Sequence, residues 1–90
     1  MSVKVHFFSS FQPYVQNQAY IETTGLTIGD CLKNIIKKYP DIKRELFFRN
    51  GRLRKQIGIY LNGQNAYPHE LAKPVKEGDE IYIMWVLAGG

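Results

Sequence analysis

The residues with the clearest chemical potential stand at the C-terminus, where the sequence reads Leu87-Ala88-Gly89-Gly90 directly after a strand-like segment. We expect the last group to be a free carboxylate on a thin tail. Glycine has no Cβ, so a Gly-Gly end can pass through a channel too narrow for any other residue. The four residues after Val86 reach about 13 Å, which is enough to cross the rim of a partner's pocket. Gly90 is therefore the candidate reactive residue, although chain ends are commonly disordered and without function.

The composition is typical of a small globular domain. The chain has 90 residues, 44% of them hydrophobic, and this size leaves no room for a large enclosed active site. No apolar run approaches the roughly 20 residues that span a bilayer, and alternation begins at Val3, so we expect no signal peptide. These features predict a cytoplasmic protein without membrane contact that is not an enzyme by itself.

The single cysteine, Cys31, excludes an internal disulfide and is too little for a zinc or iron–sulfur site. It stands in the middle of an apolar helical stripe, where a buried small hydrophobe is more common than a nucleophile. We therefore expect no metal site and no cofactor bound by this chain.

The formal net charge of +4 is unevenly distributed along the chain. Residues 33–55 hold nine basic residues against two acids, and residues 70–80 hold four acids against two lysines. No aromatic ladder is interleaved with the basic run, and Lys33, Lys37 and Lys38 fall on the polar face of a predicted helix. The pattern favours a solvated face, or a docking site for an acidic protein, over nucleic-acid binding.

Alternating apolar residues predict strands near both ends of the chain. In the last one, Ile81, Ile83 and Trp85 share a face. Between the first two, residues 11–18 read as a turn, and Asn62-Gly63 is a hairpin signal after the third. The predicted strands are residues 3–8, 19–23, 57–61 and 80–86.

One long helix is predicted between the second and third strands. Thr27 is a candidate N-cap with Asp30 three residues later, and Pro40 ends the helix. Residues 42–48 predict a short second helical turn. The apolar residues of the long helix form one stripe, consisting of Ile28, Cys31, Leu32, Ile35, Ile36 and Tyr39.

The first and last strands both carry apolar faces and are separated by this helix. The two strands can bury these apolar faces most simply if they pair parallel in the middle of a sheet, with the helix packed across one face of it. The predicted fold class is α+β, a ubiquitin-like β-grasp with a mixed sheet of four to five strands. We assign residues 1–86 to this domain and residues 87–90 to a flexible tail.

The same alternation turns several large side chains away from the helix, namely His6, Phe8, Tyr60, Tyr82 and Met84. A contiguous exposed aromatic and apolar surface is typical of a protein interface. A register shifted by one residue would instead bury them. The predicted partner-binding residues are Phe8, Tyr60, Tyr82 and Met84 on the sheet, with Leu87, Ala88, Gly89 and Gly90 on the tail.

Several segments together point to a known family: residues 3–8, 27–32, 60–63, 74–81 and 87–90. The most specific feature is Glu-Gly-Asp-Glu-Ile at residues 77–81 combined with the closing Ala-Gly-Gly. The chain resembles the ubiquitin-like sulfur carriers, the family of the small subunit of molybdopterin synthase and of the thiamine sulfur carrier. Its length favours the molybdopterin synthase subunit, whereas Trp85-Val86 stands where many of those members carry Pro-Pro.

The resemblance implies a specific chemistry for Gly90. An E1-like activating enzyme would use ATP and magnesium to adenylate the Gly90 carboxylate, and sulfur delivery would then give a thiocarboxylate. A further implied partner is the large subunit of molybdopterin synthase, where the thiocarboxylate donates sulfur during molybdenum cofactor biosynthesis. The chain itself would be a carrier, or a non-catalytic small subunit.

Other functions remain open from the sequence. The sulfur could serve thiamine or cysteine synthesis, or Gly90 could be joined to lysines of target proteins, as in a ubiquitin-like modifier. A plain β-grasp binding module with incidental glycines is a third alternative. An enzyme in its own right is disfavoured, because no acid or nucleophile stands near His6 or His69 in the pattern.

Overall fold

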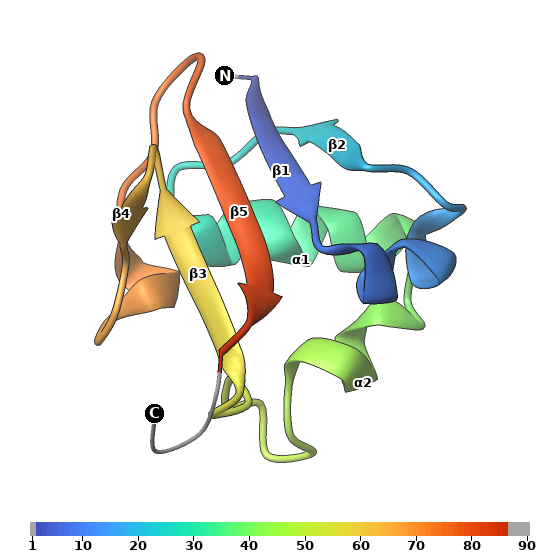
Figure 1. Cartoon of the computed structure of the whole chain (residues 1–90). Helices are drawn as coiled ribbons and strands as arrows, with labels where there is room; N and C mark the ends of the chain where they lie inside the picture. The colour runs from blue at the N-terminus through green and yellow to red at the C-terminus, as the bar shows by residue number, and fades with distance from the viewer. Residues whose placement is uncertain (1, 87–90) are drawn as a thin grey trace.

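The computed structural model describes residues 2–86 and shows a curved sheet with helices on one side (Figure 1). The elements in chain order are β1 (Val3–Phe7), the 3-10 helix η1 (Ser9–Val15), β2 (Tyr20–Thr23), α1 (Ile28–Lys38), α2 (Ile42–Leu46), β3 (Ile57–Leu61), β4 (Gln64–Asn65), the 3-10 helix η2 (Glu70–Ala72) and β5 (Glu80–Trp85).

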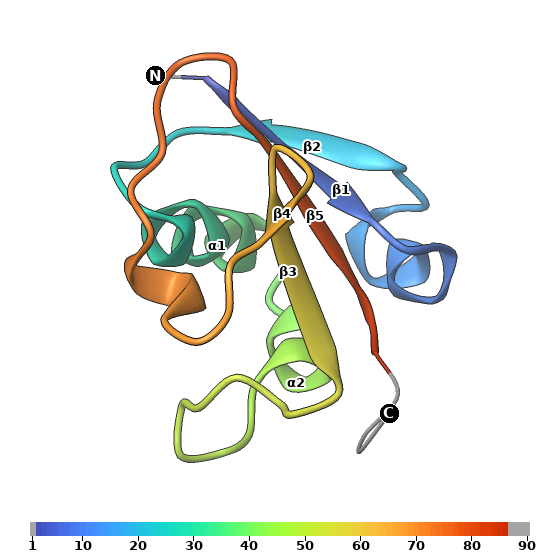
Figure 2. The same ribbon diagram turned by 60° about the vertical axis from the view of Figure 1, so that its left-hand side comes forward.

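The sheet has the strand order β2-β1-β5-β3-β4. Strands β1 and β5 pair parallel at its centre, with Val5 opposite Ile81 and His6 opposite Tyr82, and the other pairs are antiparallel. Helix α1 crosses behind β3, β5 and β1 in Figure 1, and Figure 2 shows it with η2 on one side of the sheet. The predicted β-grasp is confirmed, and so are the parallel central pair and the main helix on one face.

Helix α1 begins and ends where its sequence predicts. The Thr27 side chain accepts a hydrogen bond from the Asp30 N–H at 3.1 Å, and the Asp30 carboxylate accepts one from the Leu26 N–H at 3.3 Å. The first bond satisfies a donor that the first turn leaves free, and the second ties the residue before the N-cap to that turn. The apolar stripe, with Cys31 in it, is buried in the core except for the half-buried Ile36, whereas Lys33 and Lys37 are exposed.

The inward face of the two central strands forms the core with α1. Val5, Phe7, Ile81 and Ile83 are at most 4% exposed. Each of these side chains contributes about 1.5–3 kcal/mol by leaving water, so this face carries much of the stability of the domain.

A buried carboxylate fixes the turn that leads into β5. Asp79 is only 6% exposed and accepts hydrogen bonds from Asn62 Nδ2 and from the Lys76 N–H, both at 2.9 Å. Asn62 Oδ1 in turn accepts a hydrogen bond from the Glu80 N–H at 2.9 Å. The Asn62-Gly63 turn, with both residues at positive φ, therefore joins β3 to β4 as predicted and also holds the start of β5.

Two regions differ from what the sequence pattern predicts. Residues 11–18 are not a simple turn, because η1 occupies most of this stretch and buries Phe11 and Val15. Trp85 lies on the same face as Ile83 but is 42% exposed, because the end of β5 runs past the cover that α1 provides to the central residues. Instead, its ring stacks on Phe11 with centroids 4.8 Å apart.

Candidate functional site

The uncovered face of the sheet presents large side chains to solvent, as the alternation predicts. Phe8 is 54% exposed and Tyr82 37% exposed, while Met84 and Tyr60 are half-buried. Tyr60 on β3 stands opposite Tyr82 on β5 in the register. We call Phe8, Tyr60, Tyr82 and Met84, together with His6, the outward face. Their role in binding a partner remains a prediction.

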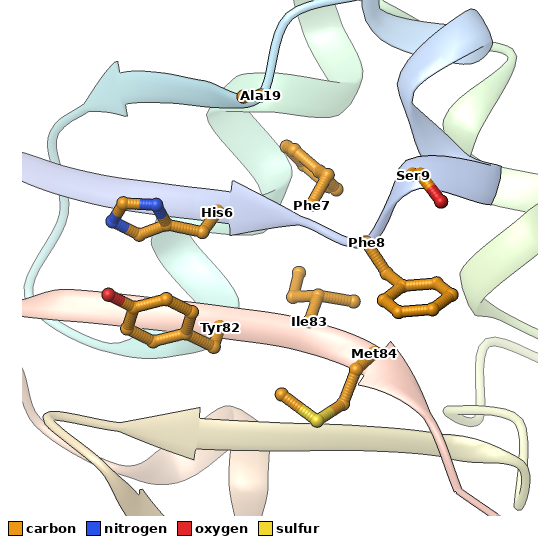
Figure 3. Close-up of a pocket in the computed structure, with 8 residues that line it drawn as sticks. All are labelled: His6, Phe7, Phe8, Ser9, Ala19, Tyr82, Ile83 and Met84. Atoms are coloured by element: carbon orange, nitrogen blue, oxygen red, sulfur yellow. The ribbon is translucent and has the colours of Figure 1, made fainter.

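A shallow groove of about 340 Å³ runs along this face where β1 meets β5. Figure 3 shows His6 and Tyr82 at one end of it and Phe8 and Met84 at the other. The Phe8 N–H donates to the Ile83 carbonyl at 3.0 Å, which extends the parallel pairing by one residue beyond β1. The backbone thus holds the Phe8 side chain at the sheet surface, above the end of β5.

His6 has an acidic neighbour that the sequence pattern does not reveal. Its Nε2 lies 2.7 Å from Glu80 Oε1, and its ring stacks on Tyr82 with centroids 4.3 Å apart and planes 6° from parallel. The expectation that no acid stands near His6 is therefore wrong. Glu80 approaches His6 only because β1 and β5 pair parallel, and this pairing brings together residues that are 74 positions apart.

Within residues 2–86, the one cysteine does not stand beside the His6–Glu80 pair. Cys31 is buried on the other side of the sheet, and burial, followed by the nearby Asp30 carboxylate, raises the pKa of its thiol. A thiol of raised pKa stays protonated and is a poor nucleophile. The His6–Glu80 contact instead orients the His6 ring, which stacks on Tyr82 at one end of the groove.

The last described residues bring the chain to the rim of the outward face. The Val86 N–H donates to the Gln56 carbonyl at 2.8 Å, which continues the pairing of β3 with β5 beyond Trp85. The candidate reactive group at Gly90, and the predicted partner contacts of Leu87, Ala88 and Gly89, lie outside the described residues. The tail therefore starts from a strand that borders the groove.

Comparison with known proteins assigns the family. The model of the ThiS family matches residues 5–90. The chain belongs to the ThiS family. A putative sulfur carrier protein from Archaeoglobus fulgidus is 29% identical to it over 91 residues, which cover all of both chains. Membership in this family confirms the resemblance to the ubiquitin-like sulfur carriers that the motifs indicate, a family of small carrier proteins.

Solved structures share the fold of this ThiS-family chain. The small archaeal modifier protein SAMP1 from Methanosarcina acetivorans is 27% identical and has a TM-score of 0.85, covering 99% of this chain and 96% of its own. A chain of the BexX/CysO complex from Amycolatopsis orientalis is 24% identical with a TM-score of 0.85, over 98% and 99%. A putative molybdopterin converting factor subunit 1 from Pyrococcus furiosus is 19% identical with a TM-score of 0.71, over 97% and 99%.

Three lysines of this ThiS-family chain lie on or beside α1, away from the groove of the outward face. A second hollow, of about 810 Å³, is lined by the apolar Ile36, Phe47 and Leu71, with Lys33, Lys37 and Lys43 among its other residues. The structure confirms that the lysines of α1 face solvent. Docking of an acidic protein to this basic side of the chain remains a prediction.

Within residues 2–86, no group of three or more His, Cys, Asp or Glu side chains could hold a metal ion. None of the helices in this part of the chain is long and apolar enough to cross a membrane.

Proposed function

We propose that this protein carries sulfur on its own C-terminus, as a thiocarboxylate of Gly90. The single observation that supports this most strongly is the position of β5. The strand supplies Tyr82 and Met84 to the outward face and leads, through Val86, directly into the Gly-Gly tail. A partner that covers this face would stand beside the origin of the tail.

The chemistry needs an activation step because a carboxylate is a poor acyl donor. In the first step a Gly90 carboxylate oxygen attacks the α-phosphorus of ATP, and pyrophosphate leaves. Sulfide, as HS⁻, then attacks the carbonyl carbon of the acyl-adenylate, AMP leaves, and loss of the proton gives the thiocarboxylate of Gly90. The adenylating enzyme supplies the ATP and magnesium site and the catalytic side chains, whereas the carrier supplies the acyl group and a docking face.

In this proposal the outward face docks on the E1-like adenylating enzyme. Phe8 and Met84 contact the partner at one end of the groove, and Tyr60 and Tyr82 contact it further along the sheet. Aromatic and methionine side chains suit this role because they give large apolar contact areas with few polar groups to desolvate. Leu87, Ala88, Gly89 and Gly90 would then enter the partner's active-site channel.

We further propose that the large subunit of molybdopterin synthase accepts the sulfur. The motifs, the chain length and the likeness to the converting factor subunit from Pyrococcus furiosus support this pathway. Transfer into thiamine or cysteine synthesis is the alternative, and the likeness to a chain of the BexX/CysO complex makes a biosynthetic partner of that kind worth testing.

Conjugation to lysines is a second candidate function. The 27% identity to the archaeal modifier SAMP1 over almost the whole chain favours it. The same adenylated Gly90 would serve both functions, and the acceptor alone would differ.

Mass spectrometry of the protein from its native cells distinguishes these functions. A sulfur carrier shows the mass gain of one oxygen replaced by sulfur at Gly90, whereas a modifier leaves a Gly-Gly remnant on lysines of other proteins. A chain lacking Gly90, expressed in the same cells, is the control and should show neither signal. Absence of both signals from the intact chain would contradict the proposal.

The protein that co-purifies with this chain tests the pathway. A large subunit of molybdopterin synthase would support the proposed pathway, whereas a thiazole-forming or cysteine-forming enzyme would show that the sulfur serves thiamine or cysteine synthesis instead.

A further inference from the structure

Strand β3 carries a glycine, Gly58, on its outward side, two residues before Tyr60. Gly58 is buried although it has no side chain, and it stands opposite Met84 in the register of β3 and β5. Glycine weakens a strand, so its presence there often marks a close approach of another part of the chain.

The group that approaches Gly58 is the side chain of Val86. A Cβ built on Gly58 would lie 2.6 Å from Val86 Cγ1, a distance that real Cβ atoms essentially never show. The same Cβ would lie 3.6 Å from Tyr60 and 3.7 Å from Met84, which are ordinary contacts. The absent side chain at position 58 thus leaves a recess that Val86 fills.

The residue before Val86 is held on the opposite face of the sheet. The Trp85 ring stacks on Phe11, and its Nε1 donates a hydrogen bond to Ser10 Oγ at 2.6 Å. The Val86 N–H is itself bonded to the Gln56 carbonyl. Trp85 and Val86 are therefore held in place on opposite faces of the sheet, immediately before the tail.

We propose that the Gly58 recess and the Trp85–Ser10 contact fix the point from which the C-terminal tail starts. The inference rests on the proposed function, in which a partner on the outward face must receive Gly90 at a defined place. A tail of four residues spans at most about 13 Å, so it has little slack to absorb a shift of its origin. A displacement of about 1 Å at a reacting group can lower a rate by about a hundredfold. Gly58, Val86 and Trp85 are positioning residues, and Gly90 carries the reacting carboxylate.

The decisive variant is Gly58→Ala, because its methyl group takes the space of Val86 Cγ1. Pyrophosphate exchange by the adenylating enzyme at saturating carrier should fall about tenfold or more. The Kd of the complex without ATP should change less than about twofold, because Gly58 itself offers no side chain to a partner. In the free protein the Val86 amide should exchange its hydrogen about tenfold faster.

Two companion variants make the test specific. The double variant Gly58→Ala/Val86→Ala removes the clashing Cγ1 atom. Its rate of pyrophosphate exchange and the protection of its residue-86 amide should return to near the values of Val86→Ala alone. Ser10→Ala removes only the acceptor of the Trp85 Nε1–H hydrogen bond. It should slow pyrophosphate exchange by about threefold, again without loss of affinity for the partner.

Three results would overturn the inference. One is a Gly58→Ala variant with the wild-type rate of pyrophosphate exchange and unchanged hydrogen exchange at the Val86 amide. Another is a double variant whose pyrophosphate exchange is as slow as that of Gly58→Ala. The third is a loss of affinity in place of rate, which would make Gly58 part of the docking surface. If the wild-type protein is not adenylated at all, the proposed function fails, and Val86 amide exchange in the free variants then decides the inference alone.

Discussion

The two faces of the central strands share one backbone and differ in almost every other respect. On β1 and β5 the inward side chains Val5, Phe7, Ile81 and Ile83 are at most 4% exposed. On the outward face, Phe8 is 54% exposed and Tyr82 37% exposed. The first set fills the space against α1, and the second set surrounds an open groove.

This difference separates the residues that hold the fold from those available for binding. A buried aliphatic side chain loses its transfer free energy and leaves a cavity when it is shortened, whereas an exposed one loses little. Large apolar side chains on the outward face therefore have no comparable role in the stability of the free protein. Exposed side chains of this kind are typical of a protein interface, which is why we propose that a partner covers them.

The largest effect on stability should come from the inward face. Ile81→Ala should lower the free energy of unfolding by about 2–5 kcal/mol, because Ile81 is fully buried and a cavity would remain. Its chain neighbour Tyr82 points the other way, so Tyr82→Ala should cost about 1 kcal/mol or less. Urea denaturation of both variants measures the difference. Equal losses would mean that the two faces do not differ as described.

A smaller effect, on binding, should come from the outward face. Phe8→Asp or Met84→Asp should weaken the complex with the adenylating enzyme by about 1–2 kcal/mol, because a charge would be buried in an apolar contact. The melting temperature should change little. Leu26→Asp is the matched control, since Leu26 is 69% exposed and lies in the loop before α1, away from the groove. An equal loss of affinity in the control would remove the distinction between the two surfaces.

The smallest effect should come from the Asp79 network at the start of β5. The hydrogen bond from Asn62, and then that from the Lys76 N–H, lower the pKa of Asp79 below its ordinary value of 3.8. The stability that this shift provides is present above that ordinary value and is lost as the pH falls toward the folded-state pKa. Asn62→Gly keeps the positive φ of this turn and removes the side chain, and should cost about 1 kcal/mol near neutral pH.

The same variant should flatten the acid limb of the stability curve, because the pKa of Asp79 in the folded protein would move back toward its unfolded value. Urea denaturation repeated from neutral pH to below pH 4 measures this. An acid limb as steep as that of the wild type would show that Asn62 does not set the pKa of Asp79.

Features with a local cause could be predicted from the sequence. The Thr27 cap with Asp30, the stop at Pro40 and the Asn62-Gly63 turn each depend on a few neighbouring residues. The sides of the strands follow from alternation, which has a period of two and needs no knowledge of the partner strand. This is why the outward placement of Phe8 and Met84 was predictable.

Features that depend on distant contacts could not be predicted in the same way. The His6–Glu80 pair, the Ser10–Trp85 hydrogen bond and the Gly58 recess all join residues far apart in the chain. The sequence pattern does not predict helix η1, because Pro13 and Asn17 resemble turn residues. The four-residue spacing of Phe11 and Val15 is the signal that could reveal its buried side.

The most direct test of activation at the Gly90 carboxylate is pyrophosphate exchange with the chain lacking Gly90. The purified adenylating enzyme is given ATP, labelled pyrophosphate and either the wild-type chain or the shortened one, whose fold is first verified by its melting temperature. We expect exchange with the wild type and none with the shortened chain, at an unchanged melting temperature. Exchange at the wild-type rate without Gly90 would show that this protein is not activated at its C-terminal carboxylate.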